Sequence, residues 1–274
     1  MDEGEWEPYE NWMKSVLRKE PFRQLWERAQ SSNNYQKEFV KRVNEWMKAE
    51  RGPYLHRMVV HEVTDTGSGL FEDAMRLYES SFPVNERETV DRVGAWVSPG
   101  GVRGADRYHL LVLCADGEAS RVAGLAMFHY LDEPSIGFLG YLAVDEKVRN
   151  RSYGSVLLAS VRDVLVRDAE LGGRPRPRGL FTELERESPD DPSTTDRFRF
   201  WRLHHMLPLT MQWEYPSLRP GENPANMCLA FLPMASPHLE LTREETAAAA
   251  RAIYKGVYGA GPDHPGLCRI LSGL

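Results

Sequence analysis

The sequence of 274 residues is short of the features that mark membrane and secreted proteins. Its longest apolar runs, such as HLLVLCA (His109 to Ala115), have the length of a strand and are too short to span a bilayer. The first ten residues, MDEGEWEPYE, are acidic and lack the basic and apolar stretches of an export signal. We therefore expect a cytoplasmic protein that does not insert into a membrane.

Cysteine is scarce and unpaired. The three cysteines, Cys114, Cys228 and Cys268, are scattered singly with no CxxC pair, and the histidines show neither HxH nor HExxH spacing. Neither a disulfide framework nor a metal site is therefore expected. Cys114 and Cys228 lie in apolar, strand-like runs, which predicts buried structural thiols, with a catalytic cysteine as the alternative.

A basic surplus is also missing. Lysine and arginine number 34 against 40 aspartates and glutamates, which gives a formal net charge of −6. Proteins that bind nucleic acids usually carry a basic face, so we expect no nucleic-acid partner. The sequence contains no GxGxxG dinucleotide fingerprint, no GK[ST] of a P-loop and no GxSxG elbow of a serine hydrolase.

The chain divides into three segments by pattern. In residues 1–52, apolar residues recur at helical spacing, which predicts a helical N-terminal extension packed on the core, with a substrate lid or a partner surface as the alternative. Residues 53–235 alternate between strands and helices. Residues 236–274 form a C-terminal tail, whose helix begins at a capping box of Thr242 and Glu245.

The middle segment runs in the order strand, two helices, hairpin, strand, helix, strand, helix and two strands. Helices are predicted at 69–82, 83–97, 152–168 and 193–206, with Pro83 and Asn85 as the start and cap of the second. Strands are predicted at 54–63, 108–116, 121–131, 136–145, 180–187, 209–215 and 226–233. This order predicts an α/β domain with one mixed central sheet flanked by helices.

The turn RNRSYG, residues 149–154, joins an apolar strand to the longest of these helices. A helix N-terminus presents unpaired N–H groups and a partial positive charge, so such a turn can hold an anion. Arg149 and Arg151 add full charges, and Gly154 would let the backbone approach closely. An ordinary strand-to-helix junction with solvated arginines is the alternative.

The spacing of this turn resembles a known motif. Arg149, Ser152 and Gly154 occupy the positions of Q/R-x-x-G-x-G/A, the pyrophosphate loop of the GNAT superfamily of N-acetyltransferases, with Ser152 in place of the first glycine. In that family the loop follows a strand that ends like LAVD (142–145) and opens a long helix, as it does here. The resemblance covers roughly residues 55–232 and implies a GNAT-like fold with acetyl-CoA as the donor.

The resemblance also implies which residues bind the donor. The strand at 142–144 would diverge from its neighbour at 181–183 and pair with the pantetheine arm, while its amides stabilise the oxyanion. Backbone amides at 151–155 would hold the pyrophosphate. The implied donor-binding residues are Leu142, Ala143, Val144, Arg149, Asn150, Arg151, Ser152, Tyr153, Gly154 and Ser155.

Acetyl transfer to an amine needs a base for the amine. Glu183 and Glu185 alternate onto one face of a predicted strand, and we favour Glu183 as the base, with ordinary solvated acids as the alternative. Glu86 and Glu88 form a second acidic group, for which a favourable interaction with a helix N-terminus is the simpler interpretation.

The acid for the leaving thiolate is less evident. Many family members carry a tyrosine in a stretch like FYxxxGF, but here FWRLHHM places Trp201 at that position, and indole cannot donate a proton near neutral pH. His204, expected with His205 on the helix face of Trp201, is one candidate acid, and Tyr215 is another. Release of the thiolate without a dedicated acid is the alternative.

These features predict an acyltransferase that moves an acetyl group from acetyl-CoA to an amino group of a small molecule or peptide, by direct attack in a ternary complex. The expected partners are a small-molecule amine acceptor and, in a homodimer, a second copy of the chain. A non-catalytic acyl-CoA-binding sensor or structural module on the same fold is the alternative. Transfer of a longer acyl group is a third interpretation.

Overall fold

The computed structural model describes residues 58–102, 104–115, 122–149, 152–187, 192–216, 227–235 and 240–274. Within it, Val59–Leu274 form one compact unit. The predicted helical extension at 1–52 lies outside the described residues. No helix in the described part of the chain is long and apolar enough to cross a membrane.

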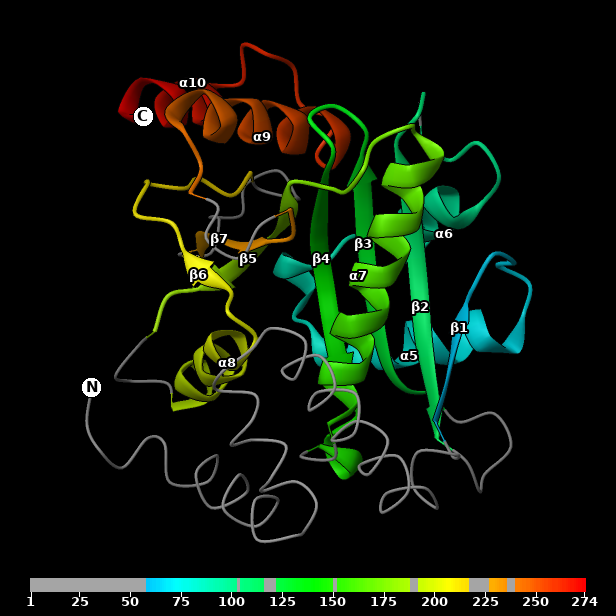
Figure 1. The fold of residues 1–274 in the computed structure, drawn as a ribbon. Helices are drawn as coiled ribbons and strands as arrows, with labels where there is room; N and C mark the ends of the chain where they lie inside the picture. The colour runs from blue at the N-terminus through cyan, green and yellow to red at the C-terminus, as the bar shows by residue number, and fades with distance from the viewer. Residues whose placement is uncertain are drawn as a thin grey trace, which may run out of the picture. The chain divides into compact units, whose positions relative to one another are not determined.

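Among the described residues, seven strands form one sheet in the order β1-β2-β3-β4-β5-β7-β6 (Figure 1). Their bounds are β1 Met58–Glu62, β2 Arg107–Ala115, β3 Val122–Leu131, β4 Ile136–Val144, β5 Gly179–Glu185, β6 Leu207–Pro208 and β7 Met227–Pro233. β4 and β5 run parallel, whereas β2–β3, β3–β4, β5–β7 and β6–β7 are antiparallel. The predicted mixed α/β fold is therefore confirmed.

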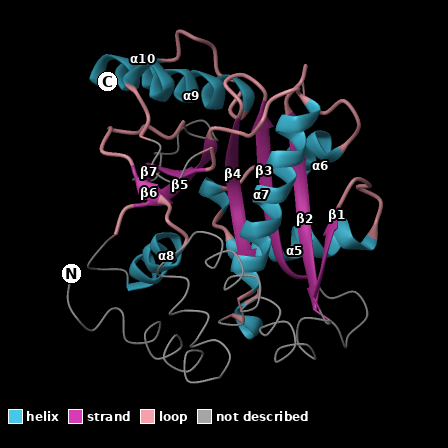
Figure 2. Cartoon of the chain, viewed as in Figure 1, coloured by secondary structure: helices cyan, strands magenta, loops and turns pink. Residues whose placement is uncertain are grey.

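Helices cover both faces of this sheet (Figure 2). Their bounds are α5 Gly69–Ser81, α6 Val90–Val97, α7 Tyr153–Leu171, α8 Pro192–Leu203, α9 Arg243–Gly256 and α10 Pro265–Gly273. α7 packs on one face of the central strands, and α5 and α6 pack on the other. Because both faces are covered, all ten residues of β3 are buried.

The half of the sheet that contains β5 and β7 has its own core. Phe181 and Phe231, on neighbouring strands, pack with Ile253 and Tyr254 of α9 and Leu267 of α10. The predicted capping box of Thr242 and Glu245 opens α9. Sequence analysis did not predict α10, which begins at Pro265 with a cap from His264. The C-terminal tail therefore completes the core beneath β5 and β7.

The predicted helix at 83–97 is wrong in its first half. Val84–Glu86 form a single 3-10 turn, and α6 starts only at Val90, capped by Thr89 rather than Asn85. The Tyr141 hydroxyl donates to the Glu86 carbonyl (3.2 Å) and accepts from the Glu88 N–H (3.1 Å). A continuous helix is not formed here because a tertiary contact holds these backbone groups.

The predicted strand at 209–215 is also wrong. Only Leu207 and Pro208 pair with β7, and the chain leaves the sheet after the Leu209 N–H donates to the Leu229 carbonyl (2.8 Å). Trp213 and Tyr215 then bury their side chains, and the Tyr254 hydroxyl donates to the Glu214 carbonyl (2.5 Å). Alternating apolar residues therefore serve an irregular segment here rather than a strand.

A buried histidine ties β1, β2 and α7 together. The Nδ1 atom of His109 lies 2.5 Å from Glu62 Oε1, and its Nε2 atom lies 2.7 Å from Asp168 Oδ2. Burial alone would lower the pKa of His109, but the hydrogen bonds to Asp168 and Glu62 outweigh it and raise the pKa overall. The hydrogen bond to His109 in turn lowers the pKa of Glu62 to about 2. The fold therefore favours a charged imidazolium between two carboxylates.

We predict that His109→Gln lowers the free energy of unfolding by about 3 to 5 kcal/mol at pH 6, because buried carboxylates lose their cation. The pKa of His109 is raised in the folded state, so its contribution is complete below the ordinary value of 6.5 and is lost as the pH rises through the folded value. Urea unfolding at pH 6 and pH 9 measures this. The exposed His61→Gln is the control, and an equal loss for His109→Gln at both pH values would contradict the account.

Candidate active site

The parallel strands β4 and β5 stay together over only three residue pairs and then diverge (Figure 1). The last pair is Leu139 and Thr182, where the Thr182 hydroxyl donates to the Leu139 carbonyl (2.8 Å). Gly140 follows as the irregular residue in the pairing of β4 with β3. From Gly140 onward, the edge of β4 that faces β5 has no strand partner among the described residues. An edge of this kind can accept an extended ligand.

A cavity of about 320 Å³ opens where the two strands separate. Acidic and aromatic side chains dominate its lining. The carboxylates come from Glu86, Glu88, Glu183 and Glu185. The large aromatic residues are Trp96, Tyr108, Tyr141, Trp201, Tyr215 and Tyr258. The cavity therefore combines apolar walls with several negative groups, an arrangement that suits a small cation.

Glu183 projects from β5 into this cavity and is held there by two donors. Its Oε1 atom accepts hydrogen bonds from Trp213 Nε1 (2.5 Å) and from the Tyr258 hydroxyl. Although both donors favour the charged form, burial outweighs them and raises the pKa of Glu183 to about 7. The carboxylate can therefore take up and release a proton near neutral pH, as a general base must.

The other carboxylates are placed differently. Glu185 forms an ion pair with Arg197 of α8. Burial and the negative charge of Glu185 raise the pKa of Glu86. Glu88 is 8% exposed, and its Oε1 atom lies 3.5 Å from Arg92 Nη1. The structure thus brings both predicted bases, Glu183 and Glu185, to one cavity and gives only Glu185 an arginine partner.

Tyr215 lines the same cavity as Glu183. It lies in the irregular segment after β6, and its ring centroid is 5.8 Å from that of Tyr258. Burial raises the pKa of Tyr215 well above its ordinary value, so the phenol keeps its proton near neutral pH. Trp201 also lines the cavity. A phenol therefore reaches the site from a segment other than the helix that carries the family tyrosine.

His204 lies elsewhere. Its Nε2 atom is 2.9 Å from the hydroxyl of Ser155 in the first turn of α7, and it is not among the residues that line the cavity. Burial lowers the pKa of His204. α8 ends at Leu203, and His205 adopts a left-handed conformation with φ of 59°, so the expected shared helix face of the two histidines is wrong.

The turn before α7 places Ser152 in the left-handed region, with φ of 64°, and the Ser152 side chain makes no capping hydrogen bond. Arg149 Nε donates to the Val144 carbonyl (3.3 Å) at the end of β4. A Cβ atom on Gly154 would lie 3.2 Å from the Phe200 ring. Gly154 is therefore needed for the packing of α7 against α8, whereas the backbone conformation that favours glycine falls on Ser152.

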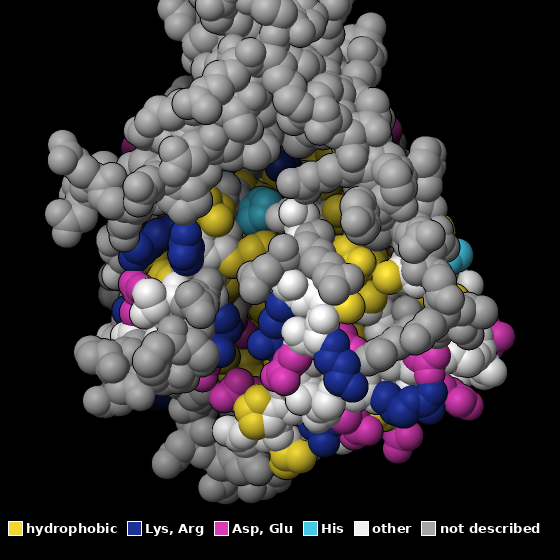
Figure 3. Space-filling view, turned by 90° about the horizontal axis from the view of Figure 1, so that it is seen from below, with side chains coloured by type: hydrophobic (Ala, Val, Ile, Leu, Met, Phe, Trp, Pro, Cys, Tyr) yellow, Lys and Arg dark blue, Asp and Glu magenta, His cyan; other side chains and the backbone are white. Residues whose placement is uncertain are grey.

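Of the remaining expected donor-binding residues, Asn150 and Arg151 lie outside the described residues. Leu142 and Val144 are half-buried on the unpaired edge, Ala143 is buried between them, and Tyr153 is buried at the start of α7. Figure 3 views the molecule from the end at which α7 begins, and basic side chains there are interspersed with acidic ones. A free strand edge beside a left-handed turn and a helix N-terminus fits a donor with an amide arm and an anionic pyrophosphate.

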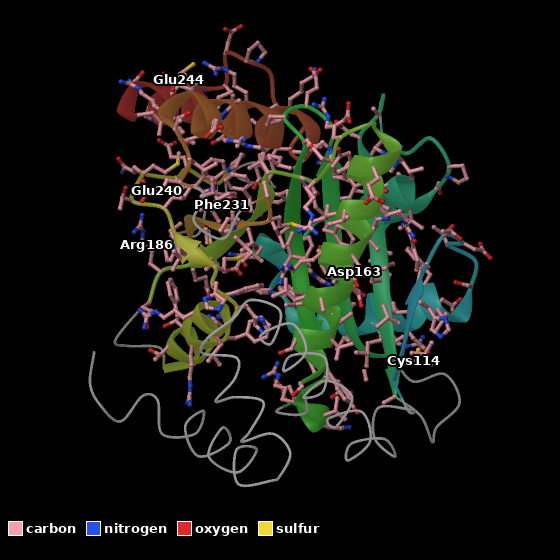
Figure 4. The ribbon with its side chains drawn as sticks, in the orientation of Figure 1. Cys114, Asp163, Arg186, Phe231, Glu240 and Glu244 are labelled. Atoms are coloured by element: carbon pink, nitrogen blue, oxygen red, sulfur yellow. The ribbon has the colours of Figure 1, made fainter. Side chains whose placement is uncertain are left out.

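The cysteines lie away from this chemistry. Cys114 is in the last turn of the pattern of β2, next to β1 and on the far side of β3 from β4 (Figure 4). Cys228 is 2% exposed in β7, opposite Leu184. Burial raises the pKa of both thiols, which disfavours the reactive thiolate. Neither cysteine lines the cavity.

Comparison with known proteins identifies the class. Residues 71–172 match the model of the acetyltransferase (GNAT) family. The chain therefore contains a GNAT acetyltransferase domain, and this family uses acetyl-CoA as its donor. The match runs from α5 to the end of α7, so it includes the turn at Ser152 but ends before Glu183 and Tyr215. No curated protein matched the sequence.

Solved structures agree on the fold. A GNAT-family protein from Bacteroides thetaiotaomicron has 18% identity, covers 74% of this chain and 99% of its own, and has a TM-score of 0.54. Arabidopsis thaliana NAA60 in complex with acetyl-CoA has 14% identity, coverage of 65% and 99%, and a TM-score of 0.46. The ribosomal-protein-S18-alanine N-acetyltransferase from Escherichia coli has 15% identity, coverage of 67% and 99%, and a TM-score of 0.41. Identities this low establish no acceptor.

Sequence reasoning missed several residues that shape the site. Tyr258 and Trp213 hold Glu183, yet they lie 75 and 30 residues from it in sequence. Tyr108 and His129 line the cavity from β2 and β3. Both lie within apolar strand patterns, so no local signal distinguished them from core residues.

We predict that Ser152→Gly raises the free energy of unfolding by up to about 1 kcal/mol, because glycine adopts a positive φ without a Cβ clash. The matched change Gly154→Ala should lower it, since the new Cβ meets the Phe200 ring. Thermal unfolding of both variants beside the wild type measures this. A Ser152→Gly variant less stable than the wild type would contradict the assignment of the turn.

Proposed function

We propose that the protein transfers an acetyl group from acetyl-CoA to an amino group of a small molecule or peptide, and that the amine attacks directly in a ternary complex. The observation that carries this proposal is the position of Glu183. Its carboxylate lies in the cavity where β4 and β5 diverge, and burial raises its pKa to about 7. The same cavity reaches Leu142 on the unpaired edge of β4.

The donor supplies a thioester whose carbonyl carbon the amine attacks. We assign the backbone of Leu142, Ala143 and Val144 to the amide arm, because this edge faces the divergence. An amide of the same edge stabilises negative charge on the carbonyl oxygen. The pyrophosphate falls to the first turn of α7 and its preceding turn. The residues assigned there are Arg149, Asn150, Arg151, Ser152, Tyr153, Gly154 and Ser155.

Glu183 acts as the base in this scheme. The carboxylates around the cavity attract an ammonium group, and Glu183 removes the proton that must leave before or during attack. Trp213 and Tyr258 fix the Glu183 side chain through one oxygen. Glu185 contributes negative charge, but its ion pair with Arg197 favours the ionised form and weakens it as a base.

Tyr215 is the proposed acid for the leaving thiolate. It keeps its proton near neutral pH, and it lines the cavity that holds Glu183. Trp201 cannot serve, because an indole N–H is not acidic near neutral pH. His204 is the second candidate, but its contact with Ser155 places it beside the proposed pyrophosphate site rather than in the cavity. A phenol inside the cavity supports an enzyme over a binding module.

We predict that Glu183→Gln lowers kcat by about 10²-fold or more, with little change in the Kd of acetyl-CoA. In the wild type, kcat/KM should rise with pH through about 7 as Glu183 loses its proton, and this rise should be absent in the variant. Thiol release over a panel of small primary amines and short peptides measures turnover, and calorimetry measures donor binding.

Glu185→Gln is the matched control for the neighbouring carboxylate. It should keep the rise in kcat/KM near pH 7. An unchanged pH profile in Glu183→Gln would show that another group is the base. Tight binding of acetyl-CoA with no turnover for any amine would instead support the non-catalytic sensor.

We predict that Tyr215→Phe lowers kcat by about 10²-fold and leaves the Kd of acetyl-CoA unchanged, because the phenol acts only on the leaving group. An acceptor assay with a more acidic thiol donor provides the check, since a thiolate that leaves readily needs less help. The variant should recover much of its lost rate with that donor. Equal losses with both donors would point to a role for Tyr215 in packing.

A further inference from the structure

Two buried polar atoms in the cavity have no role in the chemistry above. The Tyr108 hydroxyl and the Nδ1 atom of His129 have no hydrogen-bond partner among the described residues, and both residues line the cavity. The His129 side chain is only 3% exposed. Leaving a buried polar atom unpaired is costly, so such atoms in a cavity point to a ligand that pairs with them.

The two residues form one rigid subsite with Trp96. Tyr108 of β2 and His129 of β3 are direct partners in the sheet, and their ring centroids lie 4.8 Å apart. The Trp96 ring of α6 contacts both, at 5.2 Å and 5.0 Å. Arg92 lies over Trp96 at 5.0 Å. Strand pairing and ring contacts therefore fix these polar atoms in place before any ligand binds. We call Trp96, Tyr108 and His129 the His129 subsite.

Arg92 also connects this subsite to the proposed base. Its Nη2 atom donates to the carbonyls of Val257 (3.3 Å) and Tyr258 (3.4 Å). The hydroxyl of Tyr258 in turn donates to Glu183. The subsite and the base thus line one cavity and share a support, so one small molecule can contact both.

The chemistry of the subsite restricts what it can bind. Burial lowers the pKa of His129 to about 3, so the imidazole is neutral and carries one N–H donor and one acceptor nitrogen. Burial, with a contribution from the charge of Tyr141 and then Glu88, raises the pKa of Tyr108, so its hydroxyl stays protonated. A hydroxyl or a carboxamide both donates and accepts and can satisfy the two atoms in either histidine tautomer.

An anionic group suits the subsite poorly. A carboxylate only accepts hydrogen bonds, and it would approach the charge of Glu88 at the edge of the same cavity. Apolar side chains complete the lining between the subsite and Glu183, among them Met127, Phe138 and Val257. The cavity volume of about 320 Å³ is at the lower end for small-molecule sites.

We propose that the His129 subsite binds a neutral hydroxyl or carboxamide group of the acceptor. The acceptor is then a compact amine with an apolar body, a cationic amino group toward Glu183 and an uncharged polar group toward Tyr108 and His129. This inference rests on the proposed function and names the substrate class of the same site.

Four matched amines test the subsite: phenethylamine, tyramine, 4-(2-aminoethyl)benzamide and 4-(2-aminoethyl)benzoic acid. They differ only in the group opposite the amine. Binding is measured by calorimetry on the protein saturated with CoA, which carries no acetyl group to transfer. We expect the hydroxyl and carboxamide compounds to bind at least about 10-fold more tightly than phenethylamine, and the carboxylate compound to bind more weakly. Acetyl transfer to each compound is then measured by thiol release.

Tyr108→Phe should abolish most of the preference for the hydroxyl and carboxamide compounds and leave the Kd of phenethylamine unchanged. It should not lower the melting temperature, because the lost hydroxyl has no partner among the described residues. Tyr130→Phe is the control. Its hydroxyl bonds with Ser135, 3.0 Å away, so this variant should lower the melting temperature and keep the preference.

An unchanged preference in Tyr108→Phe, or no binding by any of the four amines, would overturn the subsite. Preferential binding that Tyr108→Phe removes, without any acetyl transfer, would support the subsite and contradict the proposed function. The two proposals can therefore fail separately.

Discussion

The site depends on where the hydrogen bonding between β4 and β5 stops. The two strands share only the pairs up to Leu139 and Thr182, and the Thr182 hydroxyl occupies the Leu139 carbonyl at the point of divergence. β5 then pairs along its length with β7, and β4 remains paired with β3. The divergence is therefore supported on both sides by complete ladders. It creates both an unpaired strand edge and the cavity beneath it, so the proposed donor and acceptor sites arise from one feature of the sheet.

The C-terminal helices have a functional consequence because of that feature. α9 and α10 pack against the half of the sheet that contains β5 and β7. Tyr258, which follows α9, donates to Glu183, while Tyr254 of α9 holds the irregular segment before Tyr215 through the Glu214 carbonyl. The tail thus positions the proposed base directly and the proposed acid indirectly. Such a role for the tail explains why the family match, which ends at residue 172, does not reach the groups that we assign to catalysis.

The donor side could be predicted from sequence because its signals are local. The strand, the RNRSYG turn and the long helix occupy one continuous stretch, and the family match covers all of it. Even there, the reason for Gly154 required the structure, since its neighbour Phe200 comes from a distant helix. The acceptor side could not be predicted in the same way. Glu183 was found by alternation on a strand, but the aromatic donors that hold it, and the paired rings of Tyr108 and His129, meet only through tertiary contacts.

Hydrogen–deuterium exchange with and without acetyl-CoA tests the central claim most directly, because it reports on backbone amides and needs no acceptor. The account predicts that acetyl-CoA protects amides in two segments, 142–144 at the unpaired edge of β4 and 153–155 at the start of α7. Amides of β2, which lies beyond β3, should exchange at the same rate in both states. Protection that misses both segments, or no change at all at saturating acetyl-CoA, would contradict the assignment of this divergence as the donor site.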